Sequence, residues 1–152
     1  MKTVIRLILA TLVFVLACKG GNPEKIKLSD NSNPPDIEVF SDLPSDIAGC
    51  TCMFSLDSTN YNANKYVYVN DFAQIAYMKL DGQMNKLTLS DKSKFDNKSI
   101  NAIYLNDSYE VEIEIQDRIK GGYESTINIG IITVKNKAGQ KSTKAFYGIC
   151  GC

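Results

Sequence analysis

Two Cys-x-Cys pairs limit the possible folds of this chain more than any other feature. Cys50 and Cys52 form the first pair, and Cys150 and Cys152 form the second at the end of the chain. Residues two apart on a β-strand point to the same face, so each pair is expected to line one strand face beside apolar neighbours. This arrangement predicts two disulfides that join an N-terminal strand to a C-terminal strand.

The direction of these two strands decides which cysteines pair. Antiparallel neighbours would join Cys50 to Cys152, and the inner bridge would then be Cys52 to Cys150. Parallel neighbours would join Cys50 to Cys150 instead, with Cys52 bonded to Cys152. The antiparallel pairing fits an all-antiparallel body better. Closing a loop of this length restricts the unfolded chain by roughly 4.7 kcal/mol for the first bridge, and the second adds little.

Short runs of β-branched and aromatic residues, separated by turn signals, predict strands. Seven such runs occupy residues 50–56, 65–70, 74–80, 84–89, 109–116, 126–135 and 143–150. Another short strand is expected near residues 103–105, within the polar segment 91–108. Asp81-Gly82 is typical of a type I′ hairpin turn, and residues 136–139 link the last two strands. Because no long amphipathic helix is indicated, we expect an all-β fold, a small antiparallel barrel or sandwich of about seven or eight strands.

The first 17 residues have the pattern of a secretory signal peptide. Lys2 and Arg6 precede an apolar run from Leu7 to Ala17 that only Thr11 interrupts. Such a run is too short for a permanent transmembrane helix. A buried N-terminal helix is the alternative, but it would show a polar face, which this run lacks. We therefore expect residues 1–17 to direct export.

The end of this run, Val15-Leu16-Ala17-Cys18, places an aliphatic and a small residue before a cysteine. It resembles the lipobox of bacterial lipoproteins. The resemblance implies removal of residues 1–17, thioether lipidation of Cys18 and acylation of its amino group, with palmitate as a typical acyl chain. Several acyl chains anchor a protein stably. Lys19 stands where an inner-membrane retention signal has Asp, which implies a cell-envelope location at the outer membrane.

Residues 18–45 are expected to form the lipidated cysteine and a flexible tether, and residues 46–152 the β domain. The tether segment is rich in Pro, Asn, Ser, Asp and Gly and lacks a sustained period. Its isolated apolar residues leave a second interpretation open. Ile37 with Val39, or Phe40 with Leu43, would then dock on the domain as a short strand or helical turn.

The charge balance argues against nucleic acid as a partner. The chain has 17 basic and 17 acidic residues. Loss of Lys2 and Arg6 with the signal peptide leaves 15 basic residues, a net charge of about −2 without the basic surface that nucleic acid requires. Attachment to the membrane would therefore depend on lipid.

Three other uses of the four domain cysteines are possible besides two disulfides. A zinc site usually needs C-x₂₋₄-C spacing, and export disfavours reduced thiolates. A redox-active pair would need a helix start or a histidine to lower a thiol pKa. A single bridge with two free thiols is the third alternative. With Cys18 lipidated, the remaining four cysteines are an even number in an oxidising compartment, which favours two disulfides.

The composition argues against an enzyme. The chain contains no histidine, which removes the usual general base, the Ser-His and Cys-His pairs and imidazole metal ligation. Phosphate-binding, dinucleotide-binding, nucleophile-elbow and calcium-loop motifs are also missing from the sequence. We therefore expect no catalytic residues, no metal and no cofactor.

Glu110, Glu112 and Glu114 alternate with apolar residues and should share one strand face at about 7 Å intervals. The simpler interpretation is a solvent-exposed face whose charges are balanced across the sheet by Lys135, Lys137, Lys141 or Lys144. The alternative is an acidic docking surface for a basic partner. A pair of glycosidase carboxylates would need a cleft, which an open sheet face lacks.

Ser58-Thr59-Asn60-Tyr61 is similar to the Ser-Gly-x-x-Tyr loop signature of the lysozyme-inhibitor lipoproteins. Thr59 stands where that family has glycine, and the cysteine spacing differs from that family's. The hairpin-like stretch 68–89 also resembles that class. The resemblance implies a small β-barrel with Ser58 and Tyr61 as partner-binding residues. The Cys-Gly-Cys tail is similar to that of uncharacterised bacterial lipoproteins, which implies no activity.

Together these features predict a noncatalytic, lipid-anchored binding protein of the cell envelope. The eight tyrosines are explained by cross-strand packing or by a platform for a protein or glycan ligand. The most specific form of the prediction is an inhibitor of a basic glycosidase such as lysozyme. The alternative is a structural or accessory subunit of an envelope assembly.

Overall fold

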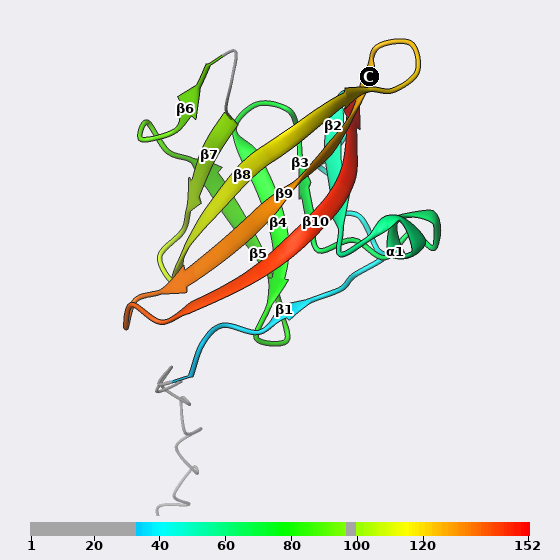
Figure 1. The fold of residues 1–152 in the computed structure, drawn as a ribbon. Coiled ribbons are helices and arrows are strands. Elements are labelled where there is room, and N and C mark those ends of the chain that lie inside the picture. Colours follow the sequence, from blue (N-terminus) through cyan, green and yellow to red (C-terminus); the bar gives the residue numbers. More distant parts are fainter. Residues whose placement is uncertain (1–32, 97–99) are drawn as a thin grey trace, which may run out of the picture.

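Eight antiparallel strands close into a barrel in the computed structural model, which describes residues 33–96 and 100–152 (Figure 1). Each barrel strand pairs with the next in the chain, and the last pairs with the first. These strands are β2 (Thr51–Ser55), β3 (Tyr68–Asn70), β4 (Ile75–Leu80), β5 (Gln83–Leu89), β7 (Ile100–Leu105), β8 (Tyr109–Lys120), β9 (Ser125–Asn136) and β10 (Lys141–Gly151). The predicted all-β antiparallel fold is confirmed, in its barrel form.

Three short elements lie outside the barrel wall. β1 (Ile37–Glu38) pairs with the end of β4, and β6 (Lys94–Phe95) pairs with the start of β7. Helix α1 (Ser58–Asn62) connects β2 to β3. Within the described ranges, no helix is long and apolar enough to cross a membrane. The predicted signal peptide and Cys18 lie outside the described residues.

The predicted strand runs are confirmed with shifted ends. β8 extends to Lys120, four positions beyond the predicted end at residue 116, because a β-bulge between Ile115 and Asp117 changes the alternation without ending the strand. The strand expected near residues 103–105 begins earlier, at Ile100. The Asp81-Gly82 turn has positive φ at both residues, 50° and 82°, as a type I′ turn requires.

The barrel interior is filled mainly at one end. Side chains from alternate positions of all eight strands form the main core, which includes Met78, Leu80, Leu87, Val111, Ile132 and Val134, each at most 1% exposed. A second, smaller cluster lies outside the barrel, where Phe40, Tyr66, Val69 and Tyr77 are buried together. The second cluster explains why β3 is buried on both faces.

The two disulfides hold the closing seam of the barrel, between β2 and β10. Cys50 is bonded to Cys152, and Cys52 is bonded to Cys150. Cys52 and Cys150 are also directly opposite in the β2–β10 ladder. The antiparallel pairing is therefore the correct one. All four sulfurs are bonded in pairs, so the zinc site and the single bridge with two free thiols are wrong.

The packed domain begins before residue 46, within the predicted tether. Ile37 and Phe40 are buried, and Phe40 exchanges two backbone hydrogen bonds of 2.8 Å with Tyr66. At the start of this segment the Asn33 carbonyl accepts a 3.1 Å hydrogen bond from Asn136 Nδ2. The second interpretation, docking of the apolar residues, thus holds for Ile37 and Phe40, whereas Val39 and Leu43 remain exposed. We call residues 33–46 the N-terminal strap.

Two carboxylates of the strap form ion pairs with lysines of the barrel. The Lys79 ammonium, 3.0 Å away, holds the pKa of Glu38 below its usual value, and Lys86 and Tyr77 do the same for Asp46. A carboxyl whose pKa is lower in the folded state adds stability above its unfolded pKa of about 4 and loses that stability as the pH falls through the folded value.

We therefore expect the double variant Glu38→Gln, Asp46→Asn to flatten the fall of unfolding free energy below about pH 5. Urea unfolding at a series of pH values measures this slope. Asp42→Asn is the matched control, because Asp42 is exposed and makes no ion pair within the described residues. An unchanged slope in the double variant would show that these pairs do not hold the strap.

A candidate ligand cavity at the open end of the barrel

The end of the barrel that carries the disulfides is hollow. A cavity of about 590 Å³ lies there, lined by residues from β2, β3, β5, β7, β8, β9 and β10. This volume is within the range of small-molecule binding pockets, roughly 300–1,000 Å³. In Figure 1 this end is the upper one, where the C-terminus is marked.

Residue size along the strands explains the hollow at this end. Toward the other end the inward positions carry Met, Leu, Ile and Val. At the hollow end the inward positions include the small Ala102 on β7 and the Cys52–Cys150 bridge. The stacked rings of Phe54 and Phe146, with centroids 4.2 Å apart, separate the two regions. Phe54 lines the cavity, whereas Phe146 does not, so the ring pair forms the cavity floor.

One wall of the cavity carries a fully bonded polar group. Asn70 donates hydrogen bonds to the hydroxyls of Tyr68 (2.9 Å) and Tyr104 (3.0 Å). Its side-chain oxygen accepts from the backbone N–H groups of Cys52 and Phe72, both at 3.1 Å. Burial, together with Tyr104, raises the pKa of Tyr68 well above its ordinary value. Tyr68 is therefore held in its neutral form.

Asn128 on β9 is the unsatisfied polar group of the cavity. Its side chain is fully buried and lines the cavity. The side-chain nitrogen donates to the Thr126 carbonyl (3.0 Å) and to the Thr126 hydroxyl (3.1 Å). The side-chain oxygen has no hydrogen-bond partner among the described residues. A buried acceptor without a partner costs about 1–3 kcal/mol.

Arg118 on β8 lies at the mouth of the same cavity. Before the bulge, the odd-numbered residues Ile113 and Ile115 face inward. The bulge shifts the alternation by one residue, so beyond it the even-numbered Arg118 lines the cavity. Arg118 is directly opposite Asn128 in the β8–β9 ladder. It forms no ion pair within residues 33–96 and 100–152. A cation is thus available in the lining of the cavity.

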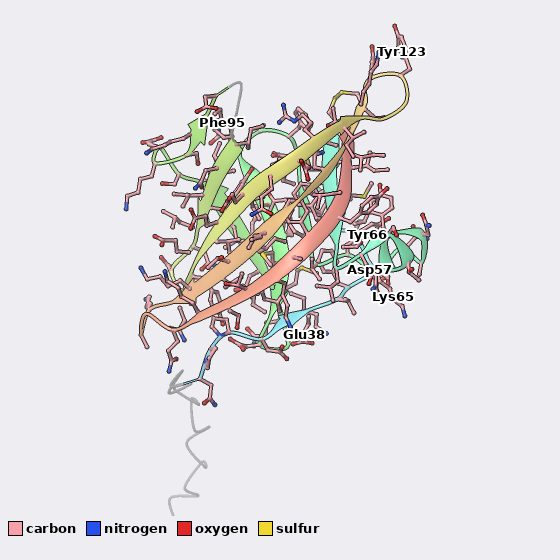
Figure 2. All side chains as sticks on the ribbon, in the orientation of Figure 1. Glu38, Asp57, Lys65, Tyr66, Phe95 and Tyr123 are labelled. Carbon is pink, nitrogen blue, oxygen red and sulfur yellow. A yellow bond between two sulfur atoms is a disulfide. The ribbon has the colours of Figure 1, made fainter. Side chains whose placement is uncertain are left out.

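Two exposed aromatic side chains stand at the rim. Phe72 is 57% exposed and Phe95 60% exposed, and both line the cavity. Figure 2 shows Phe95 at the upper end of the barrel, together with Tyr123 on the β8–β9 loop. Phe72 has a φ of 61°, which is unfavourable for an aromatic residue. Strained conformations of this kind are often found at ligand-binding loops.

The three predicted acidic site residues lie away from the cavity, on the outer face of β8. Glu110 pairs with Lys135 across the ladder (3.6 Å), as the solvent-face interpretation expects. Glu112 accepts a 2.6 Å hydrogen bond from Asn101 on β7. Glu114 is exposed, 3.4 Å from the Gln116 amide nitrogen. The structure therefore places these acids on one face without forming a cleft.

The predicted partner-binding residues Ser58 and Tyr61 lie on helix α1, also outside the barrel. The carboxylate of Asp57 caps this helix and accepts from Asn60 N–H at 2.7 Å, which lowers the Asp57 pKa. Ser58 is exposed, whereas the Tyr61 ring packs edge-on against Tyr66 and Tyr147, both with centroids 5.8 Å away. Tyr61 thus has a packing role on the barrel wall.

Sequence reasoning missed Arg118 and Asn128. Asn128 stands in the apolar run 126–135 at an inward position, and a polar residue there was a usable signal. Arg118 gave no signal, because the bulge that turns it inward is not visible in the alternation pattern. Within the described part of the chain, no group of three or more His, Cys, Asp or Glu side chains is placed to hold a metal ion.

Comparisons with known proteins add no family to this description. No protein-family model matches the chain, and neither a curated protein nor a solved structure matches it. The functional argument therefore depends on the cavity itself.

Proposed function

We propose that this chain is a noncatalytic, lipid-anchored binding protein of the cell envelope that holds a small amphipathic molecule in the open end of its barrel. The observation that carries the proposal is a cavity of about 590 Å³ whose mainly apolar lining includes Arg118 and the hydrogen-bonded Asn70. The walls supply apolar contact from Phe54, Ala102 and Ile113. A few fixed polar groups in a mainly apolar pocket are typical of a ligand site.

The lining favours binding over catalysis. Among the described residues that line the cavity there is no carboxylate and no lysine. Tyr68 is held neutral by burial. The chain has no histidine, so the lining offers no group that would exchange protons near neutral pH.

The position of the strap supports anchorage that leaves the cavity accessible. Asn33 hydrogen-bonds to Asn136, at the end of β9, whereas the cavity is lined by Thr126 and Asn128, near its start. The chain that leads toward Cys18 therefore enters at the opposite end of the barrel from the cavity. The strap therefore leaves the cavity mouth uncovered.

The sequence also predicted two more specific functions, a glycosidase inhibitor and an accessory subunit, and the structure supports them unequally. For a glycosidase inhibitor acting through Ser58 and Tyr61, the packed Tyr61 ring argues against a free recognition loop. For an accessory subunit, the exposed side chains of Ile119 (52%) and Ile129 (37%) on β8 and β9 offer an apolar contact surface. The small-ligand proposal is preferred because it accounts for the mainly apolar cavity at the open end of the barrel.

Filling the cavity tests the proposal. Ala102→Phe adds a ring to the cavity, and we expect it to weaken binding of the neutral fluorescent probe N-phenylnaphthylamine by about tenfold or more, with the melting temperature unchanged or raised. The probe is titrated into purified full-length protein. Ala145→Phe is the matched control, because Ala145 is exposed on the outer face of β10. Equal probe binding by the wild type and Ala102→Phe would refute the cavity as the site.

A further inference from the structure

We propose that Arg118 sets the ligand class of the cavity: a molecule with one anionic head group, held by Arg118 at the mouth, and one apolar chain inside the barrel. This inference rests on the proposed function and deepens it. Arg118 lines the cavity and is itself exposed. An anion bound there keeps part of its hydration, which limits the cost of burying its charge.

The register of the strands places Arg118 on the inner face of the barrel wall. Arg118 is directly opposite Asn128 on β9, and Asn128 is directly opposite Gly148 on β10. Gly148 is in turn opposite Phe54 on β2. Directly opposite residues project to the same face of a sheet, and Phe54 lines the cavity. The Arg118 side chain therefore leaves β8 on the cavity side of the wall.

Arg118 favours an anionic head group. Among the described lining residues it carries the single formal charge, since none of them is Lys, Asp or Glu. It forms no ion pair within residues 33–96 and 100–152. Its planar guanidinium can donate two parallel hydrogen bonds to a carboxylate. A cationic head group would be repelled by Arg118 and would find no carboxylate in the described lining.

The Asn70 amide, by contrast, is already bonded within the protein. Its nitrogen donates to the hydroxyls of Tyr68 and Tyr104, and its oxygen accepts from two backbone N–H groups. All three side chains are buried. A ligand head group would have to displace these hydrogen bonds to bind there, at a cost in free energy. This wall therefore contributes contact with the chain, and the head group is left to Arg118.

The interior of the cavity suits an apolar chain. Ile113 and Ile115 line it, and the stacked rings of Phe54 and Phe146 form its floor. Arg118 and Phe54 are three strands apart in one row of the wall, about 14 Å at the usual strand spacing. An extended chain advances roughly 3.5 Å per three bonds, so a chain of about ten carbons reaches from Arg118 to the floor.

Four ligands test the head group and the chain separately. Displacement of N-phenylnaphthylamine from purified full-length protein is measured with decanoate, decanol, decyltrimethylammonium and octanoate. We expect decanoate to bind about fivefold more tightly than decanol, and the ammonium compound to bind more weakly than decanol. Octanoate should bind about tenfold more weakly than decanoate, because two fewer methylene groups are buried. Equal affinities of decanoate and decanol would overturn the inference.

Substitutions of Arg118 test whether this residue causes the preference. Arg118→Gln should remove the preference for decanoate over decanol. Arg118→Glu should reverse the charge preference, so that decyltrimethylammonium binds more tightly than decanoate. The probe is neutral, so its affinity should stay within about twofold in both variants if the cavity is intact. A preference for decanoate that survives in Arg118→Gln would contradict the assignment of Arg118.

Lys94→Gln is the matched control for diffuse charge. Lys94 is exposed on β6 beside the lining residue Phe95, and it does not itself line the cavity. Its cross-strand partner Asn101 neighbours the lining residue Ala102, which places Lys94 and Asn101 on the outer face. We expect Lys94→Gln to leave all four affinities within about twofold. An equal loss of decanoate binding in Lys94→Gln and Arg118→Gln would count against a specific contact and overturn the inference.

The outcomes distinguish this inference from the proposed function. If the probe binds and Ala102→Phe blocks it, but decanoate and decanol bind equally, the cavity is a ligand site and the head-group inference is wrong. If Ala102→Phe blocks the probe but not decanoate, the anion binds outside the cavity, and the inference is again wrong. If the probe does not bind at all, the proposed function fails, and this inference fails with it.

Discussion

Removing both disulfides is expected to lower the free energy of unfolding by about 5 kcal/mol, although removing the outer one alone lowers it by less than about 1 kcal/mol. The bridges close loops of nearly equal length, with sequence separations of 102 for Cys50–Cys152 and 98 for Cys52–Cys150. Either bridge alone therefore restricts the unfolded chain almost as much as both together. The second bridge adds little loop entropy once the first has fixed the ends.

The test is a double-mutant cycle by urea unfolding. Cys50→Ala, Cys152→Ala removes the outer bridge, and Cys52→Ala, Cys150→Ala removes the inner one. The inner pair should cost about 1–2 kcal/mol by itself, because its side chains are buried at 8% and 6% exposure and their contacts are lost. The quadruple variant should then exceed the sum of the two by about 3 kcal/mol. Additive costs would show that each bridge stabilises the folded state independently.

Much of the barrel follows from local sequence signals. The strand runs were predictable because β-branched and aromatic residues alternate with polar ones, and Asp81-Gly82 specifies its turn through positive φ. The disulfides were predictable because two cysteines with Cys-x-Cys spacing share a strand face. The sequence did not fix the relative direction of the two strands that carry the cysteines. The closed barrel sets it, because β2 lies beside β10 and runs antiparallel to it.

The choice between barrel and sandwich was not visible in the sequence, because both use the same alternation. Closure depends on strand pairs far apart in the chain, such as β2 with β10, and a single sequence contains no direct record of them. The strap illustrates the same limit. Ile37 and Phe40 lie in a segment with the composition of a linker, yet both are buried on the barrel.

The candidate site could not be predicted for a different reason. The sequence offered the acidic stripe of β8 as a possible docking surface, with a balanced solvent face as the simpler interpretation. The structure places the stripe on the outer face, where Lys135 balances Glu110. The cavity instead arises from inward residues of seven strands, and one of them, Arg118, faces inward because of a bulge. Only Asn128 was detectable in principle, as a polar residue in an inward apolar series.

Gly148→Ala is expected to destabilise the barrel by about 3 kcal/mol, because a Cβ at this position has no room. The added atom would lie 2.2 Å from the Met53 carbonyl oxygen and 2.3 Å from Cδ1 of Phe54. Gly148 is directly opposite Phe54 in the β2–β10 ladder, and the Phe54 ring lies across it. Glycine at this position therefore allows the aromatic floor of the cavity to form at the closing seam.

The clash cannot be relieved by moving the seam apart, because the Cys52–Cys150 bridge ties the same two strands two residues away from Gly148 and Phe54. Gly122→Ala is the matched control. A Cβ at Gly122 meets only the Ser125 hydroxyl, at 3.7 Å, so this change should shift stability by no more than about 0.5 kcal/mol. Urea midpoints of both variants measure the difference. Equal midpoints would show that Phe54 can leave the seam without cost, and the ring pair would then not be the fixed floor on which the cavity depends.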